Sequence, residues 1–168
     1  MIVFLPTIIA TVKKSLAKRS IRDLFSENDL LRIKDACREA EENTSGEIRV
    51  DIRHRYEKGV NNVEEQIRRD FTGYGMEKTR ERTGVLILLV LKQRQFAILG
   101  DEGIHQKLGQ DYWYRQAALL AQNFQDGNFA GALCAAVRDV GEKLALHFPC
   151  HPDDSNELPD DVIVGPRE

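Results

Sequence analysis

The apolar run from Val85 to Leu91 constrains the fold more than any other part of the sequence. It is too short to cross a bilayer as a helix, which needs roughly 20 residues. Gly84 precedes it and the polar cluster KQRQ at residues 92–95 follows it. Such a bounded run is typical of a strand buried on both faces, so we expect it to lie at the centre of the fold.

The residues after this run predict a hairpin that leads into a candidate site. The KQRQ cluster predicts a turn, and Phe96 to Leu99 predict a second strand antiparallel to the first. This strand leads into Gly100-Asp101-Glu102-Gly103. Two acids between two glycines at the end of a core strand are typical of a functional loop, because glycine frees the backbone and the sheet holds the loop in place.

Four helices are predicted from apolar residues at helical spacing and from capping residues before them. Ser26, with Asp29 three residues later, predicts a helix start. The first expected helix covers about 27–43, and the second begins at about 63 after an Asn61 or Asn62 cap. The third covers about 112–125 after an Asp111 cap, and the fourth about 129–147 after an Asn128 cap. A short helical turn is expected at 104–109.

Residues 47–53 alternate between charged and apolar side chains, which predicts a strand with one buried face. The charges at 47, 49, 51 and 53 indicate an edge strand or a partly covered one. His54 at its exit is expected to face solvent in a structural role.

The order of these elements predicts a three-layer α/β/α sandwich around a small mixed sheet with a central β-hairpin. We expect an N-terminal extension at 1–24, one domain at 25–149, and an acidic, Pro-rich tail at 150–168. The tail is expected to be extended or disordered. Its segment 162–164 is apolar enough to dock on the domain.

The composition narrows the class of protein. The net charge of −3, with both signs interspersed, argues against a nucleic-acid footprint. The basic excess at residues 13, 14, 18, 19 and 22 favours a solvated arm; the alternative is a weak contact with an anionic membrane surface. Cys37, Cys134 and Cys150 show no disulfide pattern, which fits a reducing, cytoplasmic location.

Residues 1–10 are apolar, and the first lysines come after them. A signal peptide has the opposite order, with a basic segment before the apolar one. The apolar segment at 1–10 is also too short to span a membrane. We expect an extension without a transmembrane segment, with a membrane-proximal anchor as the alternative.

Several segments, taken in order, resemble the TPM domain over about residues 25–161. This family is found in a thylakoid lumen protein, a photosystem II repair protein and a receptor modulator, and in many bacterial proteins. The chain is most similar to short bacterial members that end in NELPD. The similar segments are TSGEIRV at 44–50, TRERTGVLILLV at 79–90, DEGI at 101–104, HFP at 147–149 and NELPD at 156–160.

The resemblance implies an α/β/α sandwich, and it implies several activities without fixing one. A plant member is described as a weak acid phosphatase, and some members look like binders of calcium through acidic side chains near strand ends. Bacterial members often accompany membrane proteins of the LemA type and are linked to the maintenance of membrane complexes.

Carried over to this chain, the resemblance places Asp101 and Glu102 in a loop that is glycine-rich in other members. Asp111 lies about where other members carry an Asp. The connector at 77–82, EKTRER, lacks the Asp that many members have before the central strand. Glu77 or Glu81 is a possible substitute for that Asp.

Three hypotheses follow. The first is a non-enzymatic module that binds a protein partner, a divalent cation such as Ca²⁺, or both, with Asp101, Glu102 and Asp111 as metal ligands. The second is a weak metal-assisted acid phosphatase, although no nucleophile stands out. The third is a purely structural interaction domain. Tyr112 and Tyr114, near the acidic loop, are candidates for a protein-binding surface.

Overall fold

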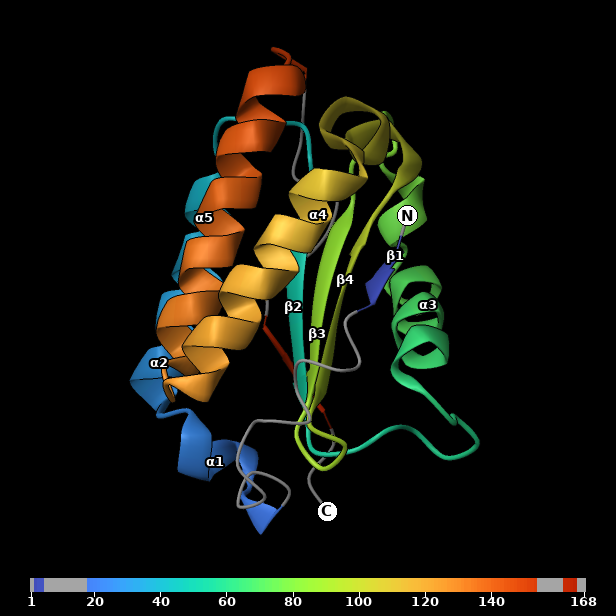
Figure 1. Cartoon of the computed structure of the whole chain (residues 1–168). Coiled ribbons are helices and arrows are strands. Elements are labelled where there is room, and N and C mark those ends of the chain that lie inside the picture. The colour runs from blue at the N-terminus through green and yellow to red at the C-terminus, as the bar shows by residue number, and fades with distance from the viewer. Residues whose placement is uncertain (1, 5–17, 154–161, 166–168) are drawn as a thin grey trace.

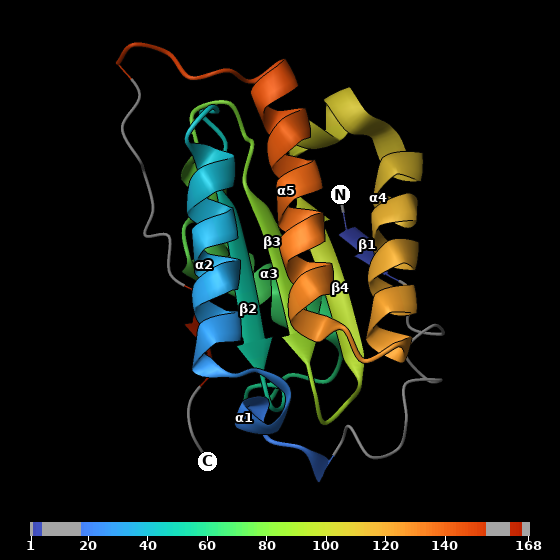
Figure 2. The same cartoon turned by 90° about the vertical axis from the view of Figure 1, so that its left-hand side faces the viewer.

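The structure is a computed structural model and describes residues 2–4, 18–153 and 162–165. Figure 1 shows the sheet between two helical layers, which confirms the expected three-layer α/β/α sandwich. One helix, α3 (Val63–Gly73), covers one face. The other face is covered by α2 (Glu27–Glu41), α5 (Phe129–His147) and α4 (Glu102–Gln125), which lie side by side in that order in Figure 2.

The sheet has the strand order β1-β4-β3-β2-β5 and is mixed. The parallel strands β2 (Ile48–Arg53) and β3 (Val85–Val90) are connected through α3, as a parallel pair requires. β3 and β4 (Gln95–Gly100) form the expected antiparallel hairpin. Two short strands from opposite ends of the sequence complete the sheet, β1 (Ile2–Phe4) beside β4 and β5 (Ile163–Val164) beside β2.

The segments expected to be an extension and a tail therefore each supply a strand. The rest of both segments, including Lys13, Lys14 and the NELPD motif, lies outside the described residues. Among the helices that the structure describes, none is long and apolar enough to cross a membrane.

β3 is buried along its whole length, as the sequence predicts. Its alternate side chains enter two separate apolar clusters. Val85, Ile87 and Leu89 pack in the larger cluster with side chains of α2, α4 and α5. Leu86, Leu88 and Val90 pack in the smaller cluster, beneath Val63, Ile67 and Phe71 of α3.

The expectation of a half-exposed or edge position for β2 is wrong. All six residues of β2 are buried, and the strand lies between β3 and β5. The buried charge of Arg53 pairs with Asp51 of the same strand and with Asp70 of α3. A buried charge that is paired and hydrogen-bonded is tolerated where an isolated one is not.

Most helix starts follow their predicted caps. Ser26 and Asp29 form the expected capping box of α2. The Asn62 side chain accepts a hydrogen bond from the Glu65 amide at the start of α3. α4 consists of two helical segments that meet at Gly109, whose φ of 72° is not helical, so the expected helical turn at 104–109 and the expected helix from about 112 are both present. The first segment begins at Glu102 with Asp101 as its N-cap, and Asp111 lies two residues after the break at Gly109. A short helix, α1 (Ile21–Leu24), and a 3₁₀ turn, η3 (Met76–Lys78), complete the structure.

The contact between α2 and α5 depends on a small residue. A Cβ at Gly141 of α5 would lie 2.5 Å from the Cβ of Ala40, against one real methyl group that cannot move without moving α2. A Cβ at Gly73, the last residue of α3, would meet nothing within 4 Å. Gly73 therefore serves as the control for a substitution at Gly141.

We predict that Gly141→Ala lowers the free energy of unfolding by about 1–3 kcal/mol, because it overpacks the α2–α5 contact. Gly73→Ala should leave stability unchanged or raise it by up to about 1 kcal/mol, because it restricts the unfolded chain. Urea unfolding of both variants measures the difference. Equal stability of the two would show that the close contact does not constrain α5.

Candidate functional site

The acidic loop at the end of β4 is held by an arginine. The Nε and Nη2 of Arg82 donate to the two carboxylate oxygens of Asp101, over 2.6 and 2.8 Å. Asp101 Oδ1 also accepts the amide of Glu102 over 2.8 Å. The hydrogen bond to Asp101 raises the pKa of Arg82. Both oxygens of this buried carboxylate therefore accept hydrogen bonds from groups of the fold.

The backbone of Arg82 reinforces this arrangement. Arg82 lies in the left-handed region, with φ of 57°, which directs its carbonyl at the start of α4. That carbonyl accepts the amides of Gly103 and Ile104, over 2.9 and 3.4 Å. A Cβ at Gly103 would lie 2.0 Å from the Glu81 carbonyl oxygen, so only glycine fits there. The turn at 79–84 thus uses donors that a helix N-terminus otherwise leaves open.

The three predicted metal ligands have different surroundings. Asp101 is buried and bonded to Arg82, whereas Glu102 is exposed and accepts a hydrogen bond from Gln106 Nε2 over 2.7 Å. Asp111 is exposed and lies beyond the interruption at Gly109. Over the ranges that the structure describes, no three His, Cys, Asp or Glu side chains gather as a metal would require. A cation site at Asp101, Glu102 and Asp111 stays a prediction.

We predict that Asp101→Ala destabilises the fold by about 1–2 kcal/mol, the usual range for loss of an N-cap side chain. Asp101→Asn should cost less, because its carbonyl oxygen still accepts a hydrogen bond from the Glu102 amide. The two free energies of unfolding, measured in urea, rank the variants. Wild-type stability in Asp101→Ala would contradict a structural role for this carboxylate.

A second cluster of charged groups lies buried between β2 and α3. Arg53 is at its centre: Nη2 bonds to Asp51, lies 2.9 Å from Asp70 Oδ2 and is 3.2 Å from Tyr74 Oη. Tyr74 donates its hydroxyl to Asp51 over 2.7 Å, and Gln66 Nε2 donates to Asp70 over 3.0 Å. Two carboxylates therefore share one guanidinium in the interior.

Sequence reasoning missed this cluster because it placed Asp51 and Arg53 on a solvent-facing side of β2. Gln66 and Asp70 lie one helical turn apart and so share a face of α3, next to the buried Ile67. This spacing was the available signal that polar side chains of α3 also face the sheet.

Burial raises the pKa of the Asp70 carboxyl to about 6 from an ordinary 3.8, although the Arg53 charge acts in the opposite direction. The folded protein thus takes up a proton between about pH 4 and 6, where the unfolded chain does not. The stability contributed by the protonated carboxyl is full below the unfolded-state pKa and is lost as the pH rises through about 6. At neutral pH the ionised Asp70 therefore weakens the fold.

We predict that Asp70→Asn raises the free energy of unfolding at pH 7.5 by on the order of 1 kcal/mol or more, because the amide mimics the protonated carboxyl. The gain should vanish near pH 4, as the wild-type carboxyl becomes protonated. Thermal unfolding across this pH range measures it.

Asp51→Asn provides the control for this prediction, because the Asp51 carboxylate is the direct partner of both Arg53 and Tyr74. It should destabilise the protein at either pH. If Asp70→Asn lowers the free energy of unfolding as much as Asp51→Asn does, the proposed destabilisation by the Asp70 carboxylate is refuted.

The outer face of α4 is the third candidate. Its inner side is fixed: Trp113 is fully buried, and Tyr112 Oη and Gln116 Nε2 donate to Asp139 of α5, over 2.7 and 2.5 Å. The outer side carries two large exposed apolar side chains, Tyr114 at 47% and Leu119 at 59% exposure. We call the exposed set Asp111, Tyr114, Arg115 and Leu119 the α4 face.

The layers, the parallel β2–α3–β3 unit and the central hairpin define a small α/β/α sandwich domain. The family model for the TPM domain matches residues 21–143, more than half of the chain. The chain therefore belongs to the TPM domain family.

A solved structure supports this assignment. The chain is similar to the BA42 protein from the psychrophilic bacterium Bizionia argentinensis, whose structure was determined by NMR. The two are 32% identical, with a TM-score of 0.76, and the match covers 87% of this chain and 99% of BA42. A comparison with curated proteins found no match.

Proposed function

We propose that this chain is a non-enzymatic TPM module that binds a protein partner through the α4 face. The observation that carries the proposal is the pair of large apolar side chains, Tyr114 and Leu119, held in solvent on a helix whose other side is locked in the core. A rigid helix that presents exposed anchors loses little conformational freedom on binding.

The composition of the α4 face supports a protein partner. On a helix, residues three and four apart are neighbours, which places Arg115 beside both Asp111 and Leu119. Tyr and Arg are enriched among the residues that dominate binding energy in protein interfaces. A partner that fits this face offers an apolar surface for Tyr114 and Leu119 and an acidic group for Arg115.

Asp101 and Arg53 already have partners within the fold, which favours binding through the α4 face over cation binding or catalysis. A cation at Asp101 would have to compete with Arg82, which donates to both carboxylate oxygens. A phosphate ester bound at Arg53 would have to displace Asp51 and Asp70 inside the core. We therefore rank the cation and phosphatase hypotheses below binding through the α4 face, which needs no such rearrangement.

The partner can be captured in cells of the source organism with a photo-crosslinking amino acid. Placed at Leu119, it should give one discrete adduct that mass spectrometry identifies; a membrane protein of the LemA type is the partner that the family resemblance suggests. Placed at Leu31 of α2, a leucine of similar exposure at 58%, it should give no such adduct.

Tyr114→Ala with Leu119→Ser should then abolish co-purification of the identified partner, and Leu31→Ser should not. The purified double variant should keep the thermal stability of the wild type, since both side chains are exposed. Identical adducts from positions 119 and 31, or co-purification that survives in the double variant, would refute the α4 face as the binding surface.

A further inference from the structure

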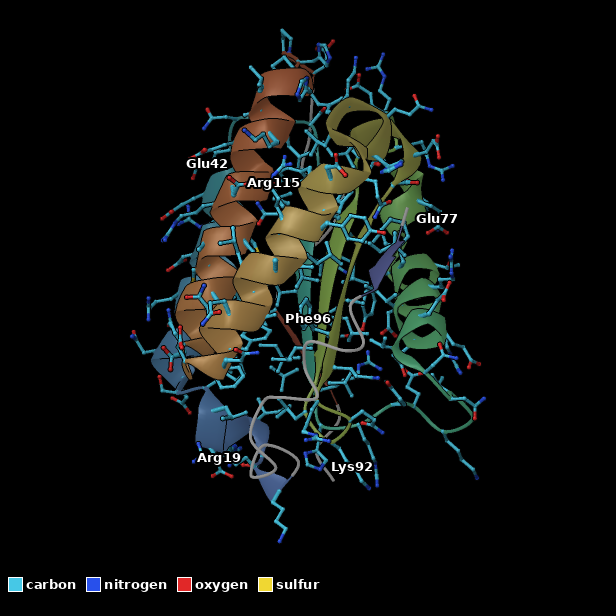
Figure 3. The ribbon with its side chains drawn as sticks, viewed as in Figure 1. Arg19, Glu42, Glu77, Lys92, Phe96 and Arg115 are labelled. Atoms are coloured by element: carbon cyan, nitrogen blue, oxygen red, sulfur yellow. The ribbon has the colours of Figure 1, made fainter. Side chains whose placement is uncertain are left out.

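One end of the molecule gathers basic side chains from three segments that are far apart in the sequence. The segments are 18–24 around α1, 54–60 between β2 and α3, and 91–94 between β3 and β4. Figure 1 shows all three at the lower end of the sandwich. Figure 3 shows Arg19 and Lys92 at this end, opposite Glu42 and Glu77 near the upper end.

The three segments are fixed to the fold, and two of them are joined to each other. The amides of Leu91 and Lys92 donate to the carbonyls of Arg53 and His54, over 3.0 and 2.7 Å, which joins the hairpin turn to the exit of β2. Ile21 and Leu24 of α1 pack against the larger apolar cluster. The basic groups are therefore presented on a preformed surface.

Within these three segments the charge is mostly positive. The three segments hold seven Lys and Arg residues and two acids, on a chain whose net charge is −3. Both acids have partners within the fold: Asp23 accepts the amide of Ser20, and Glu57 pairs with Arg69 over 3.1 Å. We call five of the exposed cations, Lys18, Arg19, Arg22, Lys58 and Lys92, the basic end.

The hairpin turn keeps a cation at a conformational cost. Arg94 has φ of 54°, a left-handed conformation that glycine or asparagine adopts more easily. A turn selected for stability alone favours those residues at this position. The turn nevertheless places an arginine at this end of the molecule.

We propose that the basic end docks on an anionic lipid surface and orients the domain on it. Lys and Arg side chains at the tips of three separate segments form a broad end, which suits a plane of lipid headgroups. Binding of single-stranded nucleic acid relies on exposed aromatic rings for stacking. Tyr56, the one aromatic residue in the three segments, is half-buried, and its hydroxyl bonds to Gln95.

The charge of the whole chain makes this docking dependent on orientation. A protein with a net charge of −3 gains nothing from approaching an anionic surface with an arbitrary face. The proposal therefore places the basic end against the lipid. Replacing it should therefore have a far larger effect than replacing as many cations elsewhere.

The test is co-sedimentation of the full chain with vesicles of phosphatidylcholine and phosphatidylserine, in a ratio of about three to one, in about 0.1 M NaCl, where the Debye length is about 10 Å. Vesicles of phosphatidylcholine alone are the blank. We expect binding to the anionic vesicles only, and its loss in about 1 M NaCl, where the Debye length falls to about 3 Å.

Two variants of equal charge decide the matter. The first changes the five residues of the basic end to Gln. The control changes Arg38, Arg68, Arg80, Lys107 and Arg138 to Gln; these are also exposed but lie outside the three segments. Each cation at an anionic surface is worth about fivefold in affinity, so the first variant should bind at least about tenfold more weakly than wild type. The control should change affinity by less than about twofold.

Circular dichroism and thermal unfolding of both variants verify that each is folded. Equal losses in the two variants, or no binding of the wild type to anionic vesicles in low salt, would overturn the proposal. Binding of a single-stranded RNA oligonucleotide that depends on the basic end, with vesicle binding the same in both variants, would overturn it in favour of a nucleic-acid partner. The readout is independent of the α4 face, so its failure leaves the proposed protein partner untouched.

Discussion

The rest of the structure depends on the burial of β3 from both sides. Its side chains alternate between two apolar clusters, and each cluster needs its own helical cover. Three helices supply the cover on one side, and on the other α3 supplies it together with Met76 of η3 (Figure 1). Because β2 and β4 flank β3, the same two layers also bury them. The three-layer architecture is thus a consequence of one strand that cannot face water.

The single helix on the second face explains the polar cluster beneath it. α3 is short, and the apolar stripe of Val63, Ile67 and Phe71 covers only part of the sheet. Next to this stripe, Asp51 and Arg53 of β2 meet Asp70. Breaking a buried pair leaves an uncompensated charge, so this cluster fixes how α3 sits on β2. The second carboxylate weakens that arrangement at neutral pH.

The sequence predicts those parts of the fold that depend on neighbouring residues. Ser26 and Asp29 are three positions apart, so the start of α2 is a local property, and the bounds of α5 follow from its own apolar stripe. The cover over β2 is not local, because Asp70 comes from another element and alternation alone cannot reveal it. The N-cap hydrogen bond of Asp101 to the Glu102 amide is local, but its ion pair with Arg82 is not, because Arg82 comes from the turn before β3.

The two proposed surfaces lie on different parts of a rigid domain, the α4 face on an outer helix and the basic end at the tips of three connecting segments. Neither needs a group that the fold already uses. Asp101, by contrast, is both a helix cap and the partner of Arg82, and the groups around it are committed to the structure. The central claim is that this loop stabilises the fold while the exposed surfaces bind.

The most direct test of that claim is a calcium titration of metal-stripped protein, followed by NMR at the amides of residues 101–111 and at the Arg82 Nε–H. The account predicts that these signals stay unchanged up to millimolar calcium, because Arg82 keeps both oxygens of Asp101. Saturable shifts at these positions that disappear in Asp101→Asn would contradict the account and establish a cation site in the acidic loop.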